Sequence, residues 1–302
     1  MQDRTVSFVG IGGANSGSDF LYTYLHAHPE TCIPKVSTHF FSDAHRYAHG
    51  IAWYEERFVQ CRAGQMRGEC ATDYLMTPAA ADRIAQSYPH AKLLAVVCHP
   101  VNRLYQEYRR AIKTGAVTKK VSLKRYIELH PESLTRGLFA DQLEAFFRLY
   151  SPLQLYVAVH EDRYADPVAY VQEAYRFLEI DDTFVPKPLR QFVVIDPENP
   201  PPKPIWWRLL RIPLAPLRWL RLDRLARYVI RKITPYVRPL LQRYQILTTE
   251  KTNRIHAPQP APIDEELRTV LHEYYAADVQ RLSDLLKRNL SREWDIESTD
   301  KS

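Results

Sequence analysis

The sequence contains few cysteines, and none of them belongs to a metal-binding or redox motif. Its four cysteines, Cys32, Cys61, Cys70 and Cys98, form no CxxC pair, which argues against a zinc knuckle and a thioredoxin-like site. A chain of 302 residues also has room for a core without a disulfide framework. We therefore expect reduced thiols, no metal site and a cytoplasmic protein.

Long apolar runs are also missing. No stretch reaches the roughly 18 apolar residues that a membrane-spanning helix requires. The first ten residues, MQDRTVSFVG, are too short and too polar to act as a signal peptide. We therefore expect neither a spanning helix nor a secretory leader.

Acidic residues are nearly absent from one strongly basic segment. The formal net charge is +6, yet Lys203 to Arg243 alone carries eleven Lys or Arg residues and one acid, Asp223. Subtracting this local balance of +10 leaves −4 for the rest of the chain, which argues against a nucleic-acid surface over the whole domain. Arginines recur there at helical spacing among Leu, Ile and Trp, a pattern typical of peripheral helices on an anionic membrane surface. A helical insert over an acceptor cleft is the alternative.

A strand, a loop of small residues and a helix follow one another near the N-terminus. The apolar run 6–11 leads into Gly, Ala, Asn and Ser at 12–18, and a helical pattern, LYTYL, follows. Backbone N–H groups of such a loop and the positive end of the helix dipole can hold an anion. The loop lacks the lysine of a Walker motif. An ordinary strand-to-helix turn is the alternative interpretation.

Strands alternate with helices along the first 180 or so residues. This alternation predicts a parallel α/β sheet with helices on both faces, and ligands of such sheets bind at the carboxyl ends of the strands. The loops 12–19, 99–103 and 160–162 all follow predicted strands and should share that edge. We expect strands at 6–11, 93–98 and 153–159, and helices at 18–27, 77–87, 101–112, 136–150, 166–178 and 264–287.

Two proline-rich stretches, 196–205 and 256–263, divide the chain. They predict an α/β core over 1–195 and a basic amphipathic helical insert over 196–250. A C-terminal loop and helix over 251–302 would complete the core.

Several segments carry a family resemblance through their order and spacing. They are FVGIGGANSGSDFLYTYLHAHPE, KVSTHFF, GIAWYEERF, RGECATDYL, AKLLAVVCHPVNRLYQEYR, RGLFADQL, HEDRYADP and, near the end, EELRTVLHEYYAADVQRL with LKRNLSREW. Together they resemble the bacterial carbohydrate-type sulfotransferases, whose sulfate donor is 3′-phosphoadenosine 5′-phosphosulfate (PAPS). The resemblance implies a P-loop-like sheet of about five parallel strands. It also implies sulfate transfer to a hydroxyl of a carbohydrate or lipid-like acceptor, without a metal.

Positions that match the family's motifs, together with residues that could compensate for its missing charges, give the candidate site. His39 is the candidate base, since an imidazole suits proton abstraction near neutral pH, and Glu69 has the family's position before the YL segment. A packed loop histidine and a turn cap are the alternatives. The candidate donor-binding residues are Gly13, Ala14, Asn15, Ser16, Gly17, Ser18, Asp19, Cys98, Arg103, Gln106, Phe139, Lys251 and Arg254.

Much of the family's charged chemistry is replaced in this sequence. The loop lysine falls on Asn15, the two loop threonines on Ser18 and Asp19, the strand-end arginine on Cys98, the helix serine on Gln106, the usual acid before HFF on Ser37, and the lysine after Gly-Glu on Cys70. A catalytically inactive member that binds a nucleotide, glycan or partner protein is therefore the second hypothesis. A peripheral membrane protein acting through 203–243 is the third.

Overall fold

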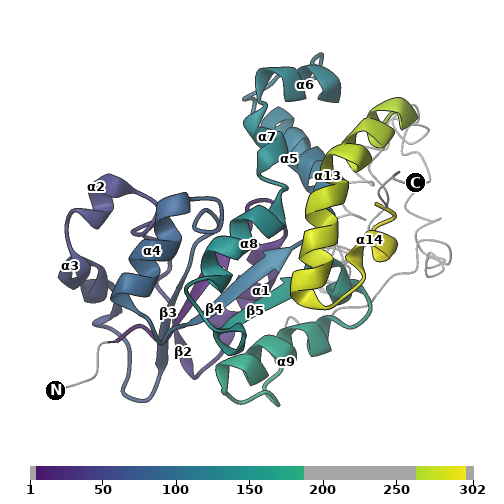
Figure 1. Cartoon of the computed structure of the whole chain (residues 1–302). Helices are drawn as coiled ribbons and strands as arrows, with labels where there is room; N and C mark the ends of the chain where they lie inside the picture. The colour runs from purple at the N-terminus through teal and green to yellow at the C-terminus, as the bar shows by residue number, and fades with distance from the viewer. Residues whose placement is uncertain (1–4, 187–262, 297–302) are drawn as a thin grey trace, which may run out of the picture. The chain divides into compact units, whose positions relative to one another are not determined.

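The computed structural model describes residues 5–186 and 263–296 (Figure 1). The basic insert predicted over 196–250 lies outside the described residues and stays a prediction.

Five parallel strands form the central sheet in the order β2-β3-β1-β4-β5. They are β1 (Phe8–Gly12), β2 (Thr31–Cys32), β3 (Met66–Cys70), β4 (Lys92–Val97) and β5 (Leu155–Val159). From β1 the chain continues toward β2 on one side of the sheet, and from β4 it continues toward β5 on the other side. The strand order therefore reverses between the neighbouring strands β1 and β4. Parallel sheets bind ligands at such a switch point. The predicted fold class is confirmed.

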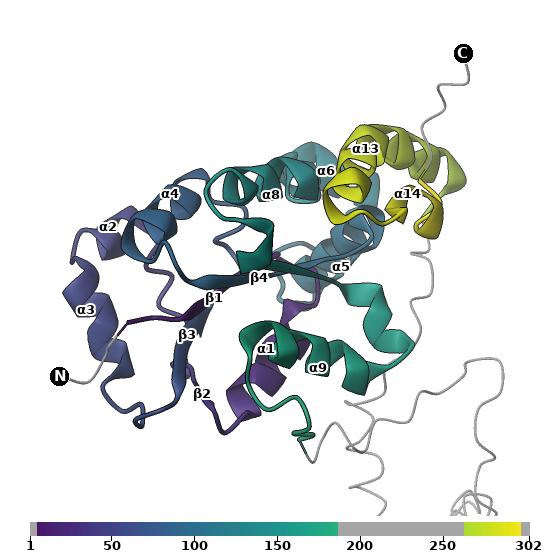
Figure 2. The same ribbon diagram turned by 60° about the horizontal axis from the view of Figure 1, so that its bottom comes forward.

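Helices lie on both faces of this sheet. Helices α1 and α9 lie on one face, and α4, α8 and α13 lie on the other (Figure 2). The helices are α1 (Ser18–Ala27), α2 (Ala44–Tyr47), α3 (Ile51–Glu55), α4 (Pro78–Ser87), α5 (Pro100–Lys113), α6 (Leu123–Leu129), α7 (Glu132–Thr135), α8 (Phe139–Phe147), α9 (Pro167–Leu178), α13 (Glu265–Leu286) and α14 (Leu290–Glu293). The described residues also form short 3₁₀ turns, η1 (Glu56–Phe58), η2 (Pro152–Gln154) and η3 (His160–Tyr164).

Local sequence explains most of these elements. Strand β4 is apolar after its first residue and is buried throughout that run, as expected for an interior strand of a parallel sheet. Helix α9 begins where Asp166 accepts hydrogen bonds from two backbone N–H groups, with Pro167 in the first turn. The helix predicted over 136–150 begins only at Phe139. Gly137 fits tightly against Tyr275, since a Cβ there would lie 2.9 Å from the ring.

The C-terminal helix is attached to α8 by one buried carboxylate. Asp278 of α13 accepts hydrogen bonds from the backbone N–H groups of Ala140 and Asp141, at 3.1 and 3.2 Å, and so caps the start of α8. Burial raises the pKa of Asp278 to about 6, although these two N–H groups favour the charged form.

The raised pKa of Asp278 predicts a pH-dependent stability. The folded protein keeps a proton there that the unfolded chain releases, so stability is lost as pH rises from about 4 to about 6, by about 3 kcal/mol at most. We expect Asp278→Asn to remove this dependence in urea unfolding between pH 4 and 7. Asp284→Asn, at an exposed position of the same helix, is the control. Parallel pH curves for wild type and Asp278→Asn would contradict the prediction.

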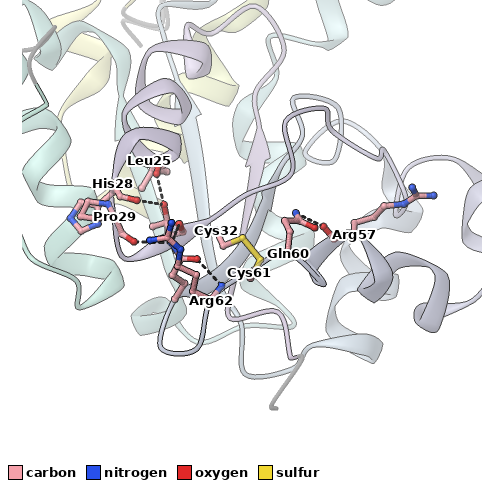
Figure 3. Close-up of a disulfide and its surroundings, with 10 residues drawn as sticks. Leu25, His28, Pro29, Cys32, Arg57, Gln60, Cys61 and Arg62 are labelled. Atoms are coloured by element: carbon pink, nitrogen blue, oxygen red, sulfur yellow. Dashed lines mark hydrogen bonds between the residues drawn. A yellow bond between two sulfur atoms is a disulfide. The ribbon is translucent and has the colours of Figure 1, made fainter. Parts of the chain in front are cut away.

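The expectation of reduced thiols is wrong for two of the four cysteines. Cys32 of β2 and Cys61, which follows η1, form a disulfide with Cα atoms 5.6 Å apart (Figure 3). The partners are 29 residues apart in sequence, and tertiary packing alone brings them together, so a search for short cysteine motifs misses them. Cys70 and Cys98 are free.

Candidate functional site

The loop after β1 is folded around one carbonyl group. Gly13 donates its N–H to the Val96 carbonyl at 3.0 Å, which ties the loop to β4. The Gly13 carbonyl accepts hydrogen bonds from the hydroxyls of Ser16, at 2.7 Å, and Ser18, at 3.3 Å. Both serines are buried. Their hydroxyls therefore support the loop from inside.

The backbone N–H groups of this loop are the available donors. Ala14, Asn15, Gly17, Ser18 and Asp19 donate their N–H groups to no atom among the described residues. The last two belong to the first turn of α1, where the helix dipole is positive. We call residues 13–19 the cradle, because such a set of donors suits an anion.

Gly17 packs directly against a histidine from the end of β5. It has φ +80°, and a Cβ at this position would lie 1.9 Å from the His160 ring, so only glycine fits. Burial, reinforced by the charge of Arg163, lowers the pKa of His160 to about 3, which keeps the ring neutral. Next to it, Asp162 forms a bidentate ion pair with Arg288 at 2.6 and 2.7 Å. The neutral ring and the paired carboxylate favour a structural role for these residues.

The remaining cradle residues differ in exposure. Asn15 has φ +58°, and the Asp19 side chain is exposed. The Asp19 carboxylate forms no hydrogen bond or ion pair with another described residue. Phe139 is buried beside the loop, 3.0 Å from where a Cβ of Gly13 would lie. Lys251 and Arg254 lie outside the described residues.

His39 belongs to a dyad with a carboxylate that sequence reasoning missed. The Nδ1–H group of His39 donates to Oδ1 of Asp73 at 2.8 Å, and the Ser42 hydroxyl donates to the other carboxylate oxygen at 2.7 Å. Both side chains of the dyad are partly exposed, at 40 and 32%. With Nδ1 as the donor, Nε2 carries the lone pair and can accept a proton. Asp73 follows the end of β3, and that position was the only available signal.

The dyad and the cradle lie on neighbouring loops. Strand β3 pairs with β1, and the N–H of Leu75 donates to the Ile11 carbonyl at 2.7 Å. A Cβ at Gly12 would lie 2.6 Å from the Thr72 carbonyl oxygen. The segment that carries Asp73 therefore runs along the start of the cradle loop. An anion and a proton acceptor can meet at this edge of the sheet.

Glu69 holds the loop that carries His39. Its fully buried carboxylate accepts hydrogen bonds from the Ser37 hydroxyl at 3.1 Å, the Thr38 N–H and the Tyr74 hydroxyl at 2.7 Å. Burial and the charge of Glu69 raise the pKa of Tyr74, which therefore stays a donor. This arrangement favours a positioning role, and the catalytic role stays a prediction.

The three predicted donor-binding residues after β4 do not form a basic pocket. Cys98 is buried, and burial together with Glu161 raises its pKa, so the thiol is neutral. Arg103 is fully buried and pairs with Glu107 at 2.5 Å. Gln106 is exposed. These three positions are therefore a neutral thiol, a compensated cation and a surface amide.

The described residues provide neither a cluster of metal ligands nor a membrane-spanning helix. They contain no group of three or more metal-ligating side chains. Among them, no helix is both long enough and apolar enough to cross a membrane.

Comparison with known proteins shows sulfotransferase relatives. Human heparan sulfate glucosamine 3-O-sulfotransferase 6 is 29% identical over 175 residues, which cover 56% of this chain and 50% of that protein. The membrane-associated sulfotransferase kil1 of Dictyostelium discoideum is 30% identical over 132 residues, or 42% of this chain and 28% of that protein. The chain therefore spans about half the length of the first of these relatives, and less of the second. No family model matches the sequence.

A solved structure has the same fold. The crystal structure of a sulfotransferase from Alicyclobacillus acidocaldarius aligns with a TM-score of 0.65 and 21% identity, over 96% of this chain and 99% of that one. Part of the chain is thus similar in sequence to sulfotransferases, and its architecture matches that of a sulfotransferase of known structure.

Proposed function

We propose that this protein transfers the sulfuryl group of PAPS to a hydroxyl of a carbohydrate acceptor. The single observation that carries the proposal is the position of the His39–Asp73 dyad beside the cradle. Sulfuryl transfer needs a donor anion held in line, stabilisation of the charge that develops, and a base for the acceptor hydroxyl. The dyad supplies the base, and the cradle supplies the anion site.

The residues present fit the phosphosulfate end of the donor. The free N–H groups of the cradle offer charge-assisted hydrogen bonds to phosphate and sulfate oxygens. His39 Nε2 takes the acceptor proton, while Asp73 orients the ring and stabilises the imidazolium that forms. For the 3′-phosphate end, Cys98 and Arg103 are unsuited, and Lys251 and Arg254 remain our candidates.

The acceptor is proposed to be an amino-sugar glycan. Three sulfotransferase relatives have heparan sulfate in their names: two are glucosamine 3-O-sulfotransferases, and one is an N-deacetylase/N-sulfotransferase. A lipid-linked acceptor at an anionic membrane is a second possibility, supported by the basic segment 203–243 and by a relative named as membrane-associated. The Cys32–Cys61 disulfide is typical of oxidising compartments and weighs against our cytoplasmic prediction.

A non-catalytic role is the second candidate function. It is favoured by the neutral thiol at Cys98 and the compensated Arg103, since neither can hold a phosphate. Such a protein would bind a glycan or nucleotide without turnover.

One pair of measurements separates these candidates. We expect calorimetry to show micromolar binding of 3′-phosphoadenosine 5′-phosphate, the spent donor. We also expect the protein to move radiolabelled sulfate from PAPS to heparan sulfate. Binding without transfer to any of a panel of glycans would favour the non-catalytic role. Absence of binding would contradict the proposed function.

A further inference from the structure

We propose that Arg110 supplies the cation that the cradle itself lacks, and that Asn15 holds it in place. This inference rests on the proposed function and adds a donor-binding residue to the same site. No residue of the loop 13–19 is basic, and Asp19 adds a negative charge. Hydrogen bonds from neutral N–H groups alone must then hold a group with several negative charges. A cation from another element would complete such a site.

One arginine from a distant part of the chain contacts the cradle. Arg110 lies near the end of α5, 95 residues beyond Asn15, and its Nη1 group donates to the Asn15 side-chain oxygen at 3.4 Å. Asn15 has a left-handed conformation, which asparagine tolerates better than most residues. Its amide is therefore presented by the loop to the guanidinium.

The charge of Arg110 is not compensated by any carboxylate among the described residues. Other arginines of this region are engaged: Arg103 and Arg136 both pair with Glu107. The guanidinium of the adjacent Arg109 lies over the Tyr105 ring, 5.9 Å from its centre. Arg110 is exposed, and Asn15 takes up only one of its five N–H donors. The other four are available to phosphate or sulfate oxygens.

The positive charge of the site thus comes from a residue of helix α5 and not from the loop itself. An arginine that reaches in from α5 offers a planar fork to an oxyanion, and the asparagine fixes the direction of that fork. The predicted ligand is the phosphosulfate group of the donor nucleotide, or the 5′-phosphate of the spent donor.

Calorimetry with 3′-phosphoadenosine 5′-phosphate tests the inference. We expect Arg110→Ala to weaken binding about tenfold or more, the effect of losing a hydrogen bond to a charged group. Arg109→Ala, the matched control on the same turn, should change affinity less than twofold. The double variant Asn15→Lys/Arg110→Ala should recover most of the loss, because it returns a cation to the loop. Because Arg110 is exposed, the melting temperature of the Arg110→Ala variant should match that of the wild type.

The outcomes separate this inference from the proposed function. If the wild type binds the nucleotide and Arg110→Ala binds it equally well, the role of Arg110 is overturned and the proposed function stands. The same holds if Arg109→Ala weakens binding as much as Arg110→Ala does. If the wild type shows no binding, both ideas fall together.

Discussion

Replacement of His39 by alanine is expected to lower kcat for sulfuryl transfer by a factor of about 10²–10⁴, the usual contribution of a general base. The spent donor should still bind with wild-type affinity, since His39 lies on the loop after β2 and not in the cradle. Radiolabelled sulfate transfer measures the first quantity, and calorimetry measures the second. Full turnover in His39→Ala would remove the dyad from the mechanism.

Asp73→Asn tests the same dyad more selectively. The carboxylate accepts a hydrogen bond from the Nδ1–H group of His39 at 2.8 Å, so Nε2 keeps the lone pair that can take a proton. An amide can offer an N–H group instead, favours the wrong tautomer and cannot stabilise the imidazolium. We expect a loss of kcat close to that of His39→Ala, with an unchanged affinity for the nucleotide. Ser42→Ala keeps both members of the dyad and removes only the Ser42 hydroxyl, which contacts Asp73 and the His39 carbonyl; it is the control and should cost far less.

Loss of the Cys32–Cys61 disulfide is expected to lower the free energy of unfolding by about 3–4 kcal/mol. The bond closes a loop with a sequence separation of 29, and loop-closure entropy gives this magnitude. Cys61 is buried, so the bond also lies partly within the core. Urea unfolding of the wild type with and without a reductant measures the effect.

The double variant Cys32→Ser/Cys61→Ser provides the control for that experiment. It should have the stability of the reduced wild type, and the reductant should not affect it further. Activity should fall with stability, because the chain leaves β2 at Cys32 and reaches His39 only seven residues later. A wild type whose unfolding is unaffected by the reductant would show that the bond contributes nothing.

Much of the fold could be predicted because its main elements have strong local signals. The run from Leu93 to Val97 is apolar without interruption, and Asp166 with Pro167 marks the start of α9. Strand β2 could not be predicted, since it has two residues and exists through its pairing with β3. The short helices α2 and α3 likewise carry too few turns for a periodic pattern.

The site was only partly predictable, for a different reason. The cradle and His39 come from contiguous segments, which a sequence pattern can identify. Asp73 and Arg110 act through contacts across 34 and 95 residues, and no spacing rule connects such positions. Arg103 was predicted as a phosphate ligand from its place on the helix, but Glu107 already neutralises it in the core. The site prediction itself stays untested.

The attachment of α13 to α8 has a consequence for how the protein is made. Asp278 caps the start of α8, and Phe139, the first residue of that helix, packs against Gly13 at the cradle. A ribosome synthesises the cradle first and Asp278 more than 250 residues later. During synthesis, the start of α8 beside the cradle therefore gains its cap only after Asp278 has left the exit tunnel, and chains that end before residue 278 should hold Phe139 less firmly against Gly13.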